Sequence, residues 1–227
     1  MLIIAIPKSA STSLMLTISK LHQLKSKQDF SFSKNRIPEN CNIIHQFHSD
    51  IRELSNAEFL NNEHLVYKQH IYPSSNNLKL TTNIKKVVLL RDPTEIILAY
   101  RRGAIKSIHN LLKGYSIEMD DDEWVTQSKQ DGLFFDLNYF YNEWKEKANP
   151  DNTLLIYYNE YVENPKQVIN RIEKFYDLKT TKRNFSTVKA RFTRRSNLNN
   201  FIYIYSNKLK DFFLSLLVYL KLKFLGK

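Results

Sequence analysis

The sequence predicts a single α/β domain in three layers, with a central parallel β-sheet of about four to five strands flanked by helices. Three observations favour this fold class. Short β-branched and aliphatic runs alternate along the chain with stretches of helical periodicity, as in parallel strands joined by crossover helices. The 227 residues suffice for one such domain with a substantial core. A hydrophobic fraction of 42% and an aromatic fraction of 13% indicate a folded chain.

Four runs are expected to form buried strands because they are apolar or β-branched over the length of a strand. They cover residues 2–6, 65–68, 86–90 and 153–157. Helices are expected at residues 11–24, 93–104 and 164–176, with at least one long amphipathic helix within 123–147. The domain is expected to span residues 1–200. Residues 201–227 are expected to form a basic amphipathic helix, packed on the domain or on a membrane surface.

The formal net charge of +11 indicates anionic partners, among which a nucleotide, a nucleic acid, an acidic glycan and a lipid headgroup all qualify. The single cysteine, Cys41, excludes an intramolecular disulfide framework and suits a reducing compartment. No secretory signal precedes the first strand, and no apolar run reaches the length of a membrane span. We therefore expect a cytoplasmic protein.

The first strand leads directly into a loop rich in hydroxyl side chains, which reads Pro-Lys-Ser-Ala-Ser-Thr-Ser-Leu over residues 7–14. A strand, a tight loop and a helix N-terminus together favour anion binding, because backbone N–H groups and the positive end of the helix dipole face the ligand. A serine-rich helix cap without a ligand is the alternative. The first glycine of the chain is Gly103, so the glycine-rich triphosphate loop is absent.

Two further motifs follow predicted strands. Lys68 and His70 are two residues apart and are expected to point to the same side. A lysine neighbour favours the neutral histidine that a general base requires, although a lone histidine in a loop is the common alternative. Arg91 follows the third strand and suits a phosphate, or a structural pair with Asp92, which can also cap the next helix. Ligands of such sheets bind beyond the carboxyl ends of the strands, so a single site is expected.

These motifs resemble those of the cytosolic sulfotransferase family. Residues 7–14 are similar to its 5′-phosphosulfate loop, usually Pro-Lys-Ser-Gly-Thr-Thr-x-Leu, and Lys68-x-His70 resembles its catalytic Lys-x-His. Arg91-Asp92-Pro93 is similar to its 3′-phosphate motif. Residues 155–160, followed by Asn164-Pro165, resemble its Tyr-Glu-Asp-Leu…Asn-Pro segment. The four pieces agree in order and spacing over residues 2–178, about three quarters of the chain.

The resemblance implies a P-loop-NTPase-like fold and a metal-independent sulfotransferase. The donor would be 3′-phosphoadenosine-5′-phosphosulfate (PAPS), leaving adenosine 3′,5′-bisphosphate (PAP). The acceptor would be a hydroxyl or amine of a carbohydrate, glycolipid or small molecule. It implies in-line attack with His70 as general base, while Lys8 and Lys68 stabilise the developing charge. The implied donor-binding residues are Lys8, Ser9, Ala10, Ser11, Thr12, Ser13, Arg91, Tyr158, Arg194 and Arg195.

Several positions depart from the family's pattern. Ala10 replaces the usual glycine, so the loop is expected to manage without a positive φ there. Ala99 stands where the family has a serine that binds the 3′-phosphate. The basic run 189–196, with Arg194 and Arg195, is expected to replace a glycine-rich segment of the family.

Other function classes account for these motifs less well. A nucleotide-dependent kinase of related fold is disfavoured, because the lysine position of its triphosphate-binding loop is missing from this sequence. A basic nucleic-acid-binding module would leave the loop and Lys68-x-His70 unexplained, so no nucleic-acid partner is expected. An inactive sulfotransferase fold remains compatible with Ala10 and Ala99. The run Asp120-Asp121-Asp122 is expected to start a solvated helix rather than bind a metal.

Overall fold

The computed structural model describes residues 1–27, 38–42, 51–62, 64–106, 111–179 and 185–187. All of them belong to one compact unit, Met1–Ala190. Arg194, Arg195 and the expected helix at 201–227 lie outside the described residues, so these expectations and the domain boundary at residue 200 stay predictions.

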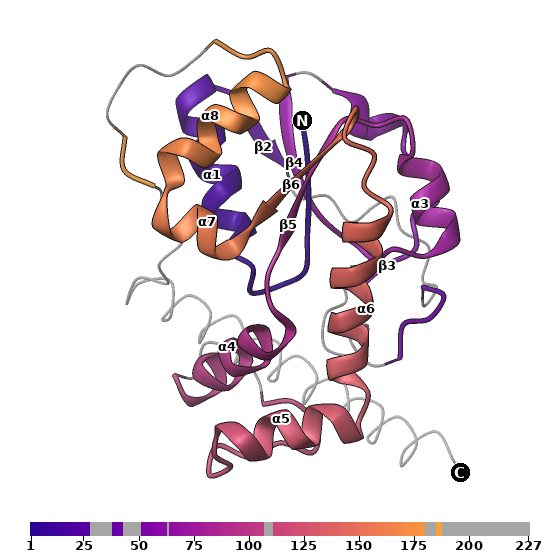
Figure 1. Cartoon of the computed structure of the whole chain (residues 1–227), viewed down its shortest axis with the longest axis vertical. Helices are drawn as coiled ribbons and strands as arrows, with labels where there is room; N and C mark the ends of the chain where they lie inside the picture. The colour runs from indigo at the N-terminus through magenta and orange to yellow at the C-terminus, as the bar shows by residue number, and fades with distance from the viewer. Residues whose placement is uncertain (28–37, 43–50, 63, 107–110, 180–184, 188–227) are drawn as a thin grey trace, which may run out of the picture. The chain divides into compact units, whose positions relative to one another are not determined.

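A parallel sheet forms the centre of this unit (Figure 1). Along its main path the strands follow the order β2 (Lys25–Lys27), β4 (Leu65–Ile71), β1 (Leu2–Ala5), β5 (Lys86–Leu90) and β6 (Thr153–Tyr157). The short β3 (Ile51–Arg52) pairs with β4 away from this path. All strand pairs are parallel, which confirms the predicted fold class.

The central strand β1 is wholly buried along its length, which explains its continuously apolar sequence. The strand predicted at residues 65–68 is longer than expected and continues to Ile71. It continues because β3 lies beside its end, pairing Ile51 with His70 and Arg52 with Ile71. His70 therefore belongs to the strand itself and not to a loop after it.

The helices predicted after β1, after β5 and near residue 165 are confirmed, and the long segment 123–147 is divided into two helices. The break falls at Gly132, whose φ of +90° lies in the left-handed region. The helices are α1 (Ser11–His22), α3 (Ser75–Thr81), α4 (Pro93–Ile105), α5 (Asp121–Gln130), α6 (Leu133–Glu146), α7 (Tyr158–Glu163) and α8 (Pro165–Phe175), with a 3₁₀ turn, η1, at Glu58–Asn61.

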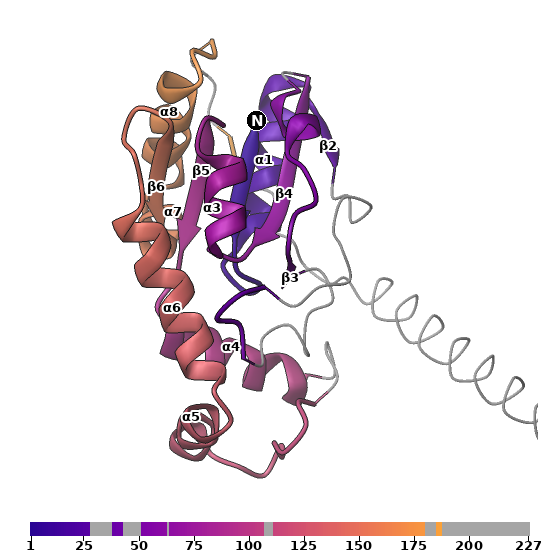
Figure 2. The ribbon, with the colours of Figure 1, turned by 90° about the vertical axis from the view of Figure 1, so that its right-hand side faces the viewer.

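Helices cover both faces of the sheet (Figures 1 and 2). The side chains of Ile3 and Val87 pack with α1, α7 and α8, whereas those of Leu2 and Val88 belong to the core on the side of α6. Trp144 of α6 donates from Nε1 to the carbonyl of Ile71, at 3.0 Å, and so ties that helix to β4. The helices α4 and α5 lie beyond the end of the sheet at which β5 leads into α4 (Figure 1). Within the described residues, no helix has the length and apolar character needed to cross a membrane.

Candidate active site

The predicted site residues that the structure describes lie at the carboxyl end of the sheet, around the end of β1. Because β1 lies between β4 and β5, the loop after β1 has Lys68 and His70 on one side and Arg91 on the other. The chain runs from β1 to the edge strand β2, returns through β4, and then crosses β1 to reach β5. Such a reversal is where open parallel sheets bind their ligands.

The loop between β1 and α1 contains two non-glycine residues in the left-handed region, Lys8 with φ 70° and Ala10 with φ 62°. The expectation that Ala10 avoids a positive φ is therefore wrong. The chain has to pass from β1 into α1 within a few residues, and Ala10 adopts this conformation immediately before the helix. An L-residue in this region costs roughly 1–2 kcal/mol. Backbone of this kind turns successive N–H groups toward a common concavity that suits an anion.

The hydroxyl residues of the loop have different surroundings. Ser9 is wholly buried, and its Oγ has no hydrogen-bond partner in the described part of the chain. Helix α1 begins at Ser11, and Leu14 N donates to Ala10 O at 3.1 Å. The amides of such a first helical turn have no intrahelical acceptor, so they favour an anion. Ser13 Oγ lies 3.1 Å from the hydroxyl of Tyr161 in α7.

Lys8 is half-buried and extends over an aromatic ring of α4. Its Nζ lies 5.4 Å from the ring centre of Tyr100, within the range of a cation–π interaction. Burial lowers the pKa of Lys8 to about 8, because the charged form loses hydration. A bound anion would offset that loss, so this lysine suits an anion site.

Lys68 and His70 point to the same side of β4, as predicted, and both are buried, with exposures of 5% and 6%. His70 Nδ1 lies 2.6 Å from the carbonyl oxygen of Ala5. A carbonyl only accepts, so Nδ1 carries the hydrogen. Lys68 Nζ lies 3.3 Å from His70 Nε2, and an ammonium group only donates. The two contacts together indicate a neutral imidazole whose Nε2 lone pair faces the lysine.

Arg91 is held by three groups and its side chain is only 9% exposed. Its Nε donates to Glu95 Oε2 at 3.2 Å, and its Nη1 donates to the carbonyl of Lys8 at 2.5 Å. The guanidinium carbon lies 3.8 Å from the ring centre of Tyr158, the first residue of α7. The structure therefore brings Arg91 and Tyr158 together beside the loop. Asp92 caps α4 by accepting from Glu95 N at 3.0 Å, as predicted.

Several contributors to this geometry were not predicted from the sequence. Glu95, in the first turn of α4, lies four residues after Arg91, and this close spacing of opposite charges could have indicated the ion pair. The backbone carbonyl of Ala5 carries no sequence signal. Tyr100 and Tyr161 read only as apolar positions of their helices, so their contacts with Lys8 and Ser13 appear only in the folded chain.

The acidic run begins α5, as predicted. Asp120 is the N-cap, and its carboxylate accepts from Glu123 N while Glu123 Oε2 accepts from Asp120 N, both at 2.8 Å. This reciprocal capping box accounts for two of the acidic residues. Among the described residues, no three side chains of His, Cys, Asp or Glu gather as metal ligands. The expectation of a metal-independent site stays a prediction.

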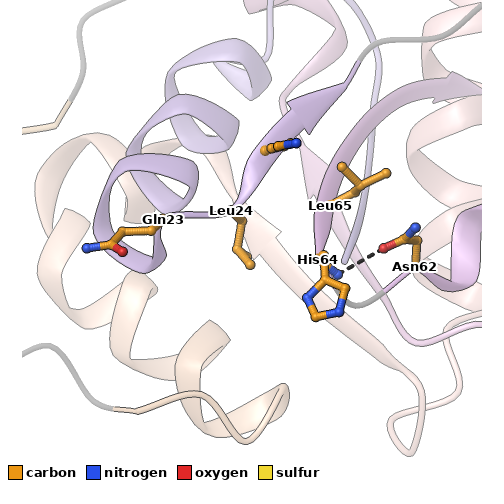
Figure 3. A pocket seen from close by; sticks show the side chains of 6 residues that line it. Gln23, Leu24, Asn62, His64 and Leu65 are labelled. Atoms are coloured by element: carbon orange, nitrogen blue, oxygen red, sulfur yellow. Dashed lines mark hydrogen bonds between the residues drawn. The ribbon is translucent and has the colours of Figure 1, made fainter.

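Figure 3 shows a shallow cavity of about 430 Å³. It lies at the amino end of the sheet, away from the loop after β1. It is found where α1 ends and where β2 and β4 begin, and His64 N donates there to Asn62 Oδ1 at 2.9 Å. Its lining comprises Gln23, Leu24, Lys25, Asn62, His64 and Leu65. None of these residues belongs to the four sequence motifs, so we assign the cavity no part in the reaction.

The sheet order and the loop at the end of its central strand define a P-loop-like α/β protein. A model of the sulfotransferase domain matches residues 1–213, so the chain belongs to the sulfotransferase family, which confirms the identification made from the four motifs. No curated protein matches this sequence.

Two solved sulfotransferase structures share the fold. A sulfotransferase from Alicyclobacillus acidocaldarius has a TM-score of 0.54 and 11% identity, covering 91% of this chain and 90% of its own. The mouse sulfotransferase SULT7A1, complexed with PAP, has a TM-score of 0.51 and 14% identity over 80% of this chain. This chain spans 59% of the length of the mouse protein.

Proposed function

We propose that the protein transfers a sulfuryl group from PAPS to an acceptor hydroxyl or amine, with His70 as the general base. One observation carries this proposal. The imidazole of His70 is fixed by its Nδ1–H bond to Ala5 O, at the end of the strand that leads into the loop with Lys8. A neutral base on β4 and the anion-binding loop after β1 thus meet at the end of β1.

The residues around the loop fit the donor. The buried hydroxyl of Ser9, which has no partner among the described residues, and the left-handed backbone at Lys8 and Ala10 suit an anion with several oxygen acceptors. We assign the 5′-phosphosulfate to Lys8, Ser9, Ala10, Ser11, Thr12 and Ser13. The 3′-phosphate is assigned to Arg91, with Arg194 and Arg195 as further proposed contacts, and the adenine to Tyr158, whose ring already stacks on a planar cation.

The Lys68–His70 contact limits how the base can act. Lys68 Nζ donates toward Nε2, the nitrogen that must take the acceptor's proton. Lys68 must therefore turn away from His70 before proton transfer, and negative charge in the loop would attract it. Lys8 and Lys68 then stabilise charge on the transferring group, which is the main contribution expected for a loose in-line transition state.

The acceptor is proposed to be a carbohydrate, a glycolipid or a small molecule. It would enter beside α4 and α5, which lie beyond the carboxyl ends of the strands (Figure 1). Exposed apolar side chains in this region, Ile105 and Ile117 among them, could contact the apolar part of an acceptor. We also propose that the protein is cytoplasmic and that residues 201–227 contact a membrane surface.

PAP binding and the loss of His70 test the proposed function. Calorimetry without magnesium should detect PAP binding, and the protein should form PAP from PAPS with at least one acceptor in a panel of sugars, glycolipids, alcohols and amines. His70→Ala should lower that rate by about 10²–10⁴-fold, the usual value of general-base catalysis, and should keep PAP affinity. His64→Ala is the matched control, since His64 is an exposed histidine at the amino end of the sheet.

Two outcomes would contradict the proposal. Full activity of His70→Ala would show that His70 is not the general base. Failure of the wild-type protein to bind PAP would show that PAPS is not the donor. Binding of ATP with magnesium in place of PAP would favour a kinase.

A further inference from the structure

Arg91 makes a contact that is not needed to bind a 3′-phosphate. Its Nη1 donates to the carbonyl oxygen of Lys8 across 2.5 Å, joining the end of β5 to the loop after β1. Lys8 is one of the two loop residues with a left-handed backbone, at φ 70°. A side chain that binds this carbonyl therefore acts on a strained part of the anion loop.

The guanidinium is well fixed for this task. Glu95 accepts from Nε, the Tyr158 ring stacks on its face, and the side chain is 91% buried. Its charge strengthens the bond to the Lys8 carbonyl relative to a bond from a neutral donor. An arginine has five N–H groups, and the described residues use two of those of Arg91. Arg91 can thus hold the loop and bind a phosphate simultaneously.

We infer that Arg91 is a positioning residue for the loop, so that one guanidinium links the two phosphate-binding ends of the nucleotide site. The 3′-phosphate assigned to Arg91 would then also steady the loop that receives the 5′-phosphosulfate. The inference rests on the proposed function for its choice of nucleotides. It concerns the effect of Arg91 on ligands that carry no 3′-phosphate.

PAP and adenosine 5′-monophosphate (AMP) differ only by the 3′-phosphate, so their affinities separate the two roles of Arg91. Arg91→Met should weaken AMP binding by about tenfold or more, the effect of losing one hydrogen bond from a charged group. It should weaken PAP binding further still. Arg101→Met is the matched control, because Arg101 also donates to a carbonyl, that of Met119, and pairs with Asp121 away from the loop. It should leave AMP affinity within about twofold.

Hydrogen exchange of the ligand-free protein gives a second measurement. The amides of residues 8–11 should exchange faster in Arg91→Met than in the wild type, while those of β1 keep their protection. If Arg91→Met does not fold, Arg91→Lys retains the charge but lacks the planar fork. It should still weaken AMP binding and speed loop exchange.

The inference is overturned if an Arg91 variant loses PAP affinity but binds AMP like the wild type and keeps its loop exchange. Arg91 would then read the 3′-phosphate alone, and the proposed function would stand. A wild-type protein that binds neither nucleotide would overturn the inference and the proposed function together.

Discussion

Ala10 has a left-handed backbone in a loop where the family resemblance implies glycine. The sequence alone predicts a loss of positive φ at this position, whereas the structure shows that the left-handed geometry is present with a Cβ attached. The cost therefore appears in the stability of the protein and not in the shape of the loop.

Ala10→Gly is expected to stabilise the fold. It removes roughly 1–2 kcal/mol of left-handed strain, while the added freedom of glycine in the unfolded chain offsets about 0.4–1 kcal/mol of it. A net gain of about 0.5–1 kcal/mol should appear as a higher midpoint in urea unfolding. Gly114→Ala is the opposite control. Gly114 has φ +88°, and an added Cβ has space, its nearest neighbour being Gln127 Nε2 at 3.7 Å. After the same unfolded-state offset of about 0.4–1 kcal/mol, this variant should lose about 0.5–1 kcal/mol. A lower midpoint for Ala10→Gly would show that the loop needs the methyl group.

Lys8 predicts how donor affinity depends on pH. Its pKa of about 8 in the free protein must rise when an anion binds, because the anion favours the charged lysine. PAP affinity should fall by only about twofold from pH 7 to 8, because half of Lys8 is still charged at its pKa of about 8. Above pH 8 it should fall by up to tenfold per pH unit, since protonation of Lys8 is then required for binding. Calorimetry from pH 7 to 9.5 measures this fall. Lys8→Arg should remove it, because a guanidinium stays charged throughout. A level wild-type profile would contradict the assignment of Lys8 to the anion.

At the scale of single elements, α5 shows what the three consecutive aspartates do. Asp120 forms the capping box with Glu123, and Asp121 pairs with Arg101 at 2.9 Å. Asp122 is exposed and only adds negative charge to the first turn. The three neighbours, which look alike in the sequence, therefore have different structural roles.

Asp120→Ala should lower the free energy of unfolding by about 1 kcal/mol, as expected for an N-cap. Asp122→Ala should cost only a few tenths of that amount at moderate salt, because it loses only an interaction with the helix dipole. Thermal unfolding of both variants, with and without calcium or magnesium, tests the pair. Stabilisation by a divalent cation that disappears in either variant would contradict the interpretation as a helix start.

Element length decided which strands and helices could be predicted. The strands β1 and β5 are wholly buried, β6 is partly buried, and all three are apolar enough to stand out. The strand β2 reads Lys-Ser-Lys and β3 has two residues, so both are strands only because β4 lies beside them. Pairing of this kind has no local signal.

At the scale of the whole molecule, the sequence predicted that the motif residues lie close together, but it did not predict which contacts they make with one another. Parallel strands bring their carboxyl ends to one edge, so Lys8, His70 and Arg91 had to be neighbours once the sheet was inferred. The sheet order, and the Arg91–Lys8 contact that depends on it, required the folded chain. Backbone conformations such as that of Ala10 also depend on how far the chain must turn between fixed elements, which side-chain identity does not reveal.

The position of β1 at the centre of the sheet also affects how this protein must be made. Leu2 pairs with Tyr67 on one side and with Lys86 on the other, so β1 has no partners until more than sixty residues have followed it from the ribosome. At roughly 5–20 residues per second, several seconds pass while this wholly apolar strand stays unpaired. Such long-range pairing slows folding and leaves an aggregation-prone segment exposed to other chains. Recombinant production should therefore benefit from slower synthesis and from chaperones that bind nascent chains.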